Sequence, residues 1–206
     1  RRRRGRERRK GGKKEEKEEK EKKKKKEIGK EDGELLLDQL SSRFGDQLVA
    51  TEVAAIDPWI EIAPEGLLEV CRFLHDDPEL RFDFLSCISG VDYFEPDPIK
   101  AAKLNWEPHL EVVYHLWSVA NKKSLVLKVI LPRWKDALGD ELPEVPSVVE
   151  VWRTADWHER EVYDLSGVHF RGHPDLRRIL CPEDWAGHPL RKDYEMPLEY
   201  HGIRCR

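Results

Sequence analysis

Histidines and carboxylates gather in the last third of the chain, where they could form a metal site. His169 and His173 are four residues apart, and Glu159 is a further candidate ligand, with His158 and His188 in reserve. Such a set would suit a metal-dependent hydrolase. However, a glycine directly before His173 and a proline directly after it disfavour a helix shared with His169. The helical motif His-Glu-x-x-His is also absent, so metal-dependent hydrolysis stays an alternative.

Patterns for other reactive centres are missing from the sequence. The chain has neither Gly-x-Ser-x-Gly nor a glycine-rich phosphate loop. Its cysteines are widely spaced and include no Cys-x-x-Cys pair: Cys71, Cys87, Cys181 and Cys205. This spacing does not fit zinc ribbons or iron–sulfur clusters and indicates free thiols in a reducing compartment. We therefore predict no catalytic, cofactor-binding or metal-binding residue in this chain.

Two near-repeats, Gly172-His173-Pro174 and Gly187-His188-Pro189, lie fifteen residues apart. Glycine and proline fix a bend at which histidine can hydrogen-bond the backbone, so both histidines are expected to be structural. Each repeat is followed by leucine and by basic side chains: Arg177, Arg178, Arg191 and Lys192. These cations suit carboxylate partners. The stretch that contains these repeats has no core of its own and is interpreted as an extended arm. Its composition is typical of a protein interface.

A charged helix is expected before these repeats. Arg160 and Asp164 can pair along one helix face, whereas Glu159 and Glu161 point to different sides. A solvated pair contributes only about 0.3–0.5 kcal/mol. Across a subunit boundary, truncating one partner of a charge pair costs about 2–5 kcal/mol. Both interpretations stay open from the spacing alone.

The stretch 157–194, WHEREVYDLSGVHFRGHPDLRRILCPEDWAGHPLRKDY, is the most specific part of the sequence. It resembles the signature region of the C subunit, the 30 kDa subunit, of proton-pumping NADH:quinone oxidoreductase (respiratory complex I). The resemblance is carried by Glu159-Arg160-Glu161 with Asp164 and Gly167, and by 172–180, 182–185 and 187–194. Two positions depart from the family: Ser166 replaces a usual aromatic residue, and Cys181 a larger apolar residue or threonine. We expect a weaker contact beneath the helix end at Ser166.

The resemblance implies a subunit without a redox centre. In this family's complex, FMN and iron–sulfur clusters of partner subunits carry electrons from NADH to a quinone, with proton translocation. The C subunit would brace the hydrogenase-large-subunit-like subunit of the quinone site, beside iron–sulfur subunits. It would lie peripherally on the cytoplasmic face of a bacterial inner membrane, and the isolated chain should not oxidise NADH. A homologous subunit of a membrane-bound hydrogenase-type complex is the nearest alternative.

The same resemblance assigns a set of side chains to the subunit interface. They are Glu159, Arg160, Glu161, Asp164, His173, Asp175, Arg177, Arg178, Asp184, Trp185, His188, Arg191, Lys192, Asp193 and Tyr194. We expect them to contact neighbouring subunits rather than to catalyse.

Apolar periodicity predicts the elements that position this stretch. Helices are expected over 34–44 and from Pro64 to Asp76, and strands over 49–56, 59–62, 82–93, 110–119 and 124–131. The third strand should turn Phe82, Phe84 and Ile88 inward, and 96–108 should be a loop. Ser147-x-x-Glu150 and Asp156-x-x-Glu159 resemble helix capping boxes, with Gly167 as the C-terminal stop. The chain should be extended from Val168 onward.

This order predicts an α+β domain over 31–142, with a mixed sheet of about five strands and helices on one face. The signature helix and the extended arm would follow over 143–206. No apolar run approaches the roughly 20 residues that span a bilayer. The N-terminus also lacks the hydrophobic segment of a secretory signal. We therefore expect a soluble, cytosolic body.

Residues 1–30 hold eighteen basic and seven acidic side chains and a single large aliphatic one, Ile28. They bury too little apolar surface to fold, which predicts a disordered tail or a solvated helix. Residues 31–206 hold nineteen basic and thirty-four acidic side chains, so a basic tail joins an acidic body. The tail attracts phosphates but has no interleaved aromatic residues, so we expect no specific nucleic-acid partner.

Overall fold

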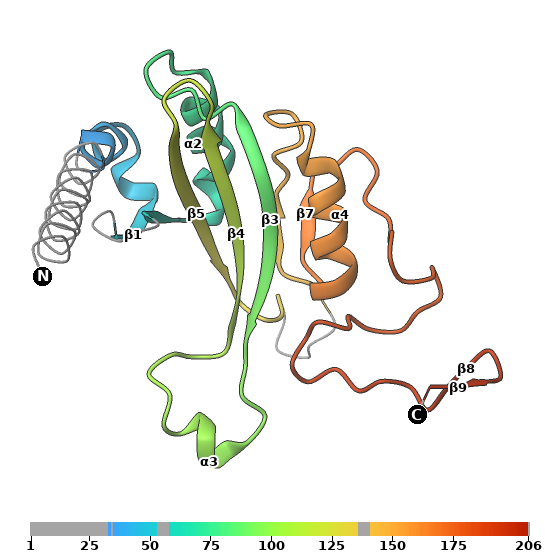
Figure 1. Cartoon of the computed structure of the whole chain (residues 1–206). Coiled ribbons are helices and arrows are strands. Elements are labelled where there is room, and N and C mark those ends of the chain that lie inside the picture. The colour runs from blue at the N-terminus through green and yellow to red at the C-terminus, as the bar shows by residue number, and fades with distance from the viewer. Residues whose placement is uncertain (1–32, 34, 53–57, 136–140, 206) are drawn as a thin grey trace, which may run out of the picture.

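The computed structural model describes residue 33 and residues 35–52, 58–135 and 141–205 (Figure 1). The predicted tail 1–30 lies outside these residues. A five-stranded sheet has the order β1-β2-β5-β4-β3. Its strands are β1 (Leu48–Glu52), β2 (Trp59–Ile62), β3 (Phe84–Tyr93), β4 (His109–Ser118) and β5 (Lys123–Leu131). Because β2 pairs parallel to β5 and the other neighbours pair antiparallel, the predicted α+β class with a mixed sheet is confirmed.

The helices follow the predicted order with shifted ends. Residues 35–44 are helical and lead into the 3-10 turn η1 (Gly45–Gln47). A second turn, η2 (Pro64–Gly66), begins where the proline predicts and continues as α2 (Leu67–Asp76). The predicted loop between β3 and β4 contains one helical turn, α3 (Pro98–Ala101), capped by the side chain of Asp97. The signature helix is α4 (Ala155–Ser166).

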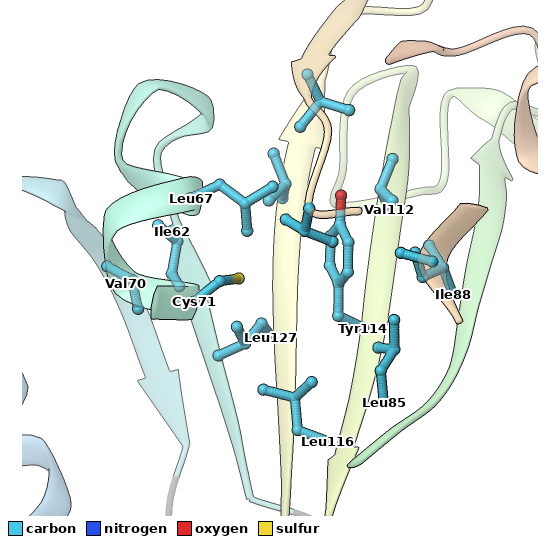
Figure 2. Close-up of a cluster of buried hydrophobic side chains, with 14 of the residues drawn as sticks. Ile62, Leu67, Val70, Cys71, Leu85, Ile88, Val112, Tyr114, Leu116 and Leu127 are labelled. Carbon is cyan, nitrogen blue, oxygen red and sulfur yellow. The ribbon is translucent and has the colours of Figure 1, made fainter. Parts of the chain in front are cut away.

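Apolar side chains at every second position give the sheet one buried face. Its fully buried side chains are Leu110, Val112, Tyr114 and Leu116 of β4 and Leu125, Leu127, Val129 and Leu131 of β5. Figure 2 shows Leu67 and Cys71 of α2 directed at this face. The same core includes Val148, Trp152, Ala155, Val162 and Phe170, so burial fixes α4 against the sheet.

One inward residue of β3 was predicted wrongly. Phe82 and Ile88 are buried as expected, but Phe84 is 48% exposed. The register shifts between Leu85 and Cys87, and such a bulge inserts an extra residue and reverses the alternation. Leu85 therefore points into the core, and Phe84 lies on the opposite face of the sheet.

Neither predicted capping box forms. Ser147 Oγ donates to Glu159 Oε2 at 2.7 Å instead of forming a capping box with Glu150. The Glu150 carboxylate binds Arg72 at 2.6 Å. Residues 149–151 and 153–154 form turns, and α4 begins after Thr154 without a side-chain cap. The long-range partner of Ser147 is stronger than the local one because it is buried. The predicted stop at Gly167 is confirmed: this residue is left-handed, with φ of 71°.

The end of α4 packs closely on β3. A Cβ at Gly90 would lie 2.7 Å from Ser166 Oγ and 3.0 Å from Val162 Cγ1. Ser166 is itself 3% exposed. At this contact a small residue on the helix meets a glycine on the strand, and the weaker contact expected at Ser166 relative to the family stays a prediction. This close approach fixes the helix end over the sheet edge.

The extended arm begins later than predicted. Val168 and Phe170 are buried, and β7 (His169–Arg171) pairs parallel with β6 (Glu144–Pro146). Beyond Arg171 the only regular structure in the described residues is a short antiparallel pair, β8 (Glu199–Tyr200) and β9 (Ile203–Arg204). In Figure 1 the arm runs from β7 past the lower end of α4 and finishes in this hairpin, away from the sheet.

Candidate subunit interface

The arm supplies hydrogen-bond donors to the C-terminal end of α4. A helix leaves its last four carbonyls without intrahelical partners. Here the carbonyls of residues 164–167 all receive a donor from the arm. His188 Nδ1 lies 2.9 Å from the Asp164 carbonyl oxygen, and the Leu190 amide donates to the Leu165 carbonyl at 2.8 Å. Arg191 donates to the Ser166 carbonyl through Nε and to the Gly167 carbonyl through Nη2, each at 2.9 Å.

The guanidinium of Arg191 is the central donor of this cap. Its Nη1 donates to the Arg133 carbonyl at 2.8 Å, and its Cζ lies 3.9 Å from the ring centroid of Trp134. Arg191 is 5% exposed. Burial and the nearby Arg133 charge lower its pKa from the usual value. A cation in this position also interacts favourably with the negative end of the helix dipole.

Asp164 organises the turn that follows the first near-repeat. Its Oδ2 accepts from the amides of residues 179, 180 and 181 at 3.1, 2.8 and 2.8 Å. Its Oδ1 accepts from Arg178 at 2.7 Å, and the side chain is fully buried. Burial opposes the charged form of Asp164, but these donors outweigh it and hold the pKa below its usual value. One carboxylate thus holds four donors of the arm against α4.

A second charged group joins the arm to the end of the sheet. Arg133 binds Asp92 of β3 at 2.8 and 2.9 Å and Asp193 of the arm at 2.7 and 3.0 Å. The Lys192 amide also donates to Asp92 at 2.8 Å. Both carboxylates favour the charged guanidinium and raise the pKa of Arg133 against the effect of burial. The hydrogen bonds of Arg133 and of the Lys192 amide therefore connect the arm to β3; Lys192 and Asp92 are one hundred residues apart in the sequence.

Glu159 is enclosed by its own chain. It is fully buried, and it accepts from Ser147 Oγ and from the Val148 amide, both at 2.7 Å. Burial raises the pKa of Glu159 to about 7, although the two hydrogen bonds act in the opposite direction. This carboxyl group ties the segment before α4 to the first turns of the helix.

The first near-repeat lies along the exposed side of α4. The His173 ring is buried, with Nε2 3.1 Å from the Asp156 carbonyl and Nδ1 accepting from the Asp175 amide at 3.0 Å. Arg160 donates to the Arg177 carbonyl at 3.3 Å. Both histidines of the near-repeats therefore hydrogen-bond the backbone, as predicted. The pair of Arg160 and Asp164 that the spacing allows does not form, because Arg178 occupies that carboxylate.

The distal arm folds back on Asp184. Tyr200 Oη donates to this carboxylate at 2.6 Å, and His201 Nε2 lies 2.7 Å from it. The rings of Trp185 and Tyr200 are 4.9 Å apart. A Cβ at Gly187, where φ is 78°, would meet the Tyr194 ring at 2.9 Å. The second near-repeat therefore needs glycine for its backbone and for close packing.

Comparison with known proteins identifies the family. Residues 60–200 match the family model described as "Respiratory-chain NADH dehydrogenase, 30 Kd subunit". The chain belongs to this family.

Curated relatives from this NADH dehydrogenase family agree over most of the chain. The C subunit of NADH-quinone oxidoreductase from Roseiflexus castenholzii is 43% identical over 168 residues, covering 82% of this chain and 87% of the relative. The C subunit from Chloroherpeton thalassium is 39% identical over 176 residues, covering 84% and 65%. A solved chain from the membrane-bound sulfane sulfur reductase, an archaeal respiratory membrane complex, has a TM-score of 0.59. It is 22% identical and covers 80% of this chain and 86% of that chain, and it shows the same fold.

The interface residues predicted from the family resemblance fall into three groups in the structure: buried, half-buried and exposed. Glu159, Arg160, Asp164 and Arg191 are buried. His173, Arg178, Trp185, His188 and Tyr194 are half-buried, and Glu161, Asp175, Arg177, Asp184, Lys192 and Asp193 are exposed. Their contact with another subunit stays a prediction, and many of them hold the arm on α4. The sequence patterns did not predict a role for Asp92, Arg133 and Trp134. Their position just inside or after the ends of predicted strands is the one feature of the sequence that could have indicated it.

The alternative metal site does not assemble in this member of the NADH dehydrogenase family. No group of three or more histidine, cysteine or acidic side chains within the described ranges could hold a metal ion. Glu159 and His173 use their polar atoms on separate parts of the backbone, and His169 lies 3.7 Å from Glu144.

We also find no helix in the described part that is long and apolar enough to cross a membrane.

Proposed function

We propose that this member of the NADH dehydrogenase family is a non-redox subunit that braces the peripheral arm of NADH:quinone oxidoreductase. In this proposal, FMN and iron–sulfur clusters of partner subunits carry electrons from NADH to quinone. The chain stabilises the hydrogenase-large-subunit-like subunit at the quinone site and contacts neighbouring iron–sulfur subunits. It is peripheral on the cytoplasmic face of a bacterial inner membrane and is held there through the complex.

One observation carries this proposal: the arm is fixed on one side and apolar on the other. Many of its polar side chains and amides are engaged on α4 and on Arg133, as described above. The apolar side chains of the arm point away from the core: Leu180, Leu190, Met196, Leu198 and Ile203 are 43–72% exposed. An ordered segment that exposes so many aliphatic side chains is typical of a surface that a partner covers.

α4 adds an aromatic side chain to the same region. Trp157 is 64% exposed, and the guanidinium of Arg160 lies 5.1 Å from its ring centroid. Arg160 in turn donates to the arm at Arg177, so Trp157 lies beside the arm. Exposed tryptophan and arginine supply a large share of the binding energy at protein interfaces. We propose that Trp157 and the apolar arm side chains form one continuous bracing surface.

The test replaces two arm side chains that touch no core. The double variant Leu198→Asp, Ile203→Asp should bind the remaining subunits roughly thirtyfold more weakly, since loss of interface anchors costs about 2 kcal/mol or more. Thermal unfolding of the purified subunit should stay unchanged. The measurement is the yield of assembled complex on native gels.

Ile99→Asp is the matched control for this variant. Ile99 is 73% exposed, like Leu198, but it lies in α3, away from the arm. The control should assemble like the wild type. Equal yields of complex for the double variant and the wild type would refute the proposed bracing surface.

A further inference from the structure

The five-stranded sheet has a second face, opposite the core, that also carries apolar side chains. The register places Phe84 opposite Trp117, and Cys87 opposite His115. His115 is opposite Val126, which in turn is opposite Trp59. Cross-strand neighbours of this kind lie about 5 Å apart, so these six side chains form one patch, here called the open-face patch.

The composition of the open-face patch is unusual for a sheet face in water. Such a face normally carries polar side chains in alternation with the buried ones. Instead, Phe84 is 48% and Trp117 37% exposed, side by side on neighbouring strands. The bulge in β3 turns Phe84 outward, as described above. Exposed aromatic pairs of this kind are enriched where proteins bind one another.

Acidic side chains border the patch on the same face. Lys128 is opposite Glu61 of β2, and Glu111 lies further along β4. Glu111 is only 8% exposed and is engaged within the chain, 4.0 Å from Lys128 Nζ and 3.5 Å from His109 Nε2. Burial and the Glu111 charge raise the pKa of Glu61, which Lys128 and His109 counteract only in part. Half-buried Glu61 is therefore the carboxylate of this border that a partner's cation can reach.

We propose that the open-face patch docks a segment of another subunit of the complex that presents apolar anchors flanked by lysine or arginine. The proposal rests on the chain's place in such a complex. The apolar anchors would cover Phe84 and Trp117, and a flanking cation would face Glu61. A second copy of this chain fits poorly, because it would bring the same carboxylates and an acidic body against themselves. The tail 1–30 supplies cations but only one large aliphatic side chain, Ile28.

The experiment places the photo-cross-linker benzoylphenylalanine at position 117 in the full complex. The expected result is one cross-link to a different subunit, at a peptide with lysine or arginine close to the attachment point. Three results would overturn the proposal: a cross-link to a second copy of this chain, a cross-link to its own residues 1–30, or no cross-link. Trp117 is partly exposed, so the replacement leaves the core intact.

A charge reversal tests the electrostatic part. With the cross-linker at position 117, Glu61→Lys should lower the cross-link yield at least about fivefold, since like charges across an interface repel. Glu65→Lys makes the same charge change at η2, on the helical side, and should leave the yield unchanged. Equal yields for both variants would contradict the proposed cations. The readout is independent of the arm, because the bracing surface is tested by the variants at positions 198 and 203.

Discussion

Replacing Asp164 by alanine is expected to destabilise the folded chain by about 3–5 kcal/mol, the usual cost of removing one partner of a buried ion pair. The variant leaves Arg178 without its carboxylate and three amides, at residues 179–181, without an acceptor. The arm should detach locally from α4. Urea unfolding of the purified subunit measures the loss, and limited proteolysis locates new cleavage near residue 180.

Asp175→Ala is the matched control. Asp175 also pairs with an arginine, Arg177 at 2.9 Å, but both side chains are more than half exposed. Solvent-exposed pairs of this kind contribute little, so this variant should unfold like the wild type. If the Asp164 variant also unfolded like the wild type, Asp164 would not be the anchor of the arm.

Replacing Glu159 by glutamine is expected to change how stability depends on pH. The pKa of Glu159 is about 7 in the folded chain, against a usual 4.5. A raised carboxyl pKa means that the folded state binds the proton more tightly. The stabilisation is complete below about pH 4.5 and is lost as pH rises through 7. Above this range the ionised carboxylate costs about 3 kcal/mol relative to a neutral group.

Glutamine keeps the acceptor for the Val148 amide and does not ionise. The Glu159→Gln variant should therefore match the wild type at pH 5 and exceed its stability at pH 8 by up to about 3 kcal/mol. Urea unfolding at the two pH values gives the difference directly. Glu161→Gln, the exposed neighbour on α4, should follow the wild type at both. A wild-type to Glu159→Gln difference that is equal at pH 5 and pH 8 would show that Glu159 stays ionised in the fold.

Features that depend on local sequence were predictable. The alternation of apolar side chains predicted the bounds of β4 and β5 nearly to the residue, because each strand has one face in the core. The glycine after the signature helix gave its end, because only a residue that tolerates positive φ continues the chain there. The near-repeats predicted histidines that hydrogen-bond the backbone, because glycine and proline fix a bend at each repeat.

Features that depend on distant partners were not predictable. Ser147 has a capping pattern with Glu150, yet its hydroxyl binds Glu159, because α4 brings a buried acceptor near it. The spacing of Arg160 and Asp164 suggests a helix pair, yet Arg178 of the arm takes the carboxylate. In both cases a buried tertiary contact outweighs an exposed local one, since solvent weakens the latter.

The interface prediction illustrates the same limit. A family signature marks positions that matter without stating which partner each one contacts. Arg191 and Asp164 lie in the signature, and the structure places both on α4 contacts within the chain. The charged pattern also did not single out the exposed aliphatic side chains between them, such as Leu180 and Leu190.

Hydrogen–deuterium exchange of the arm, in the purified subunit and in the assembled complex, tests the central claim most directly. The amides of residues 179–181 bind Asp164, so they should be protected in both states. The amides of residues 195–205 should exchange rapidly in the purified subunit and become protected at least about tenfold in the complex, where a partner covers Leu198 and Ile203. Equal exchange of residues 195–205 in the two states would contradict the account, since the outer side of the arm would then have no partner.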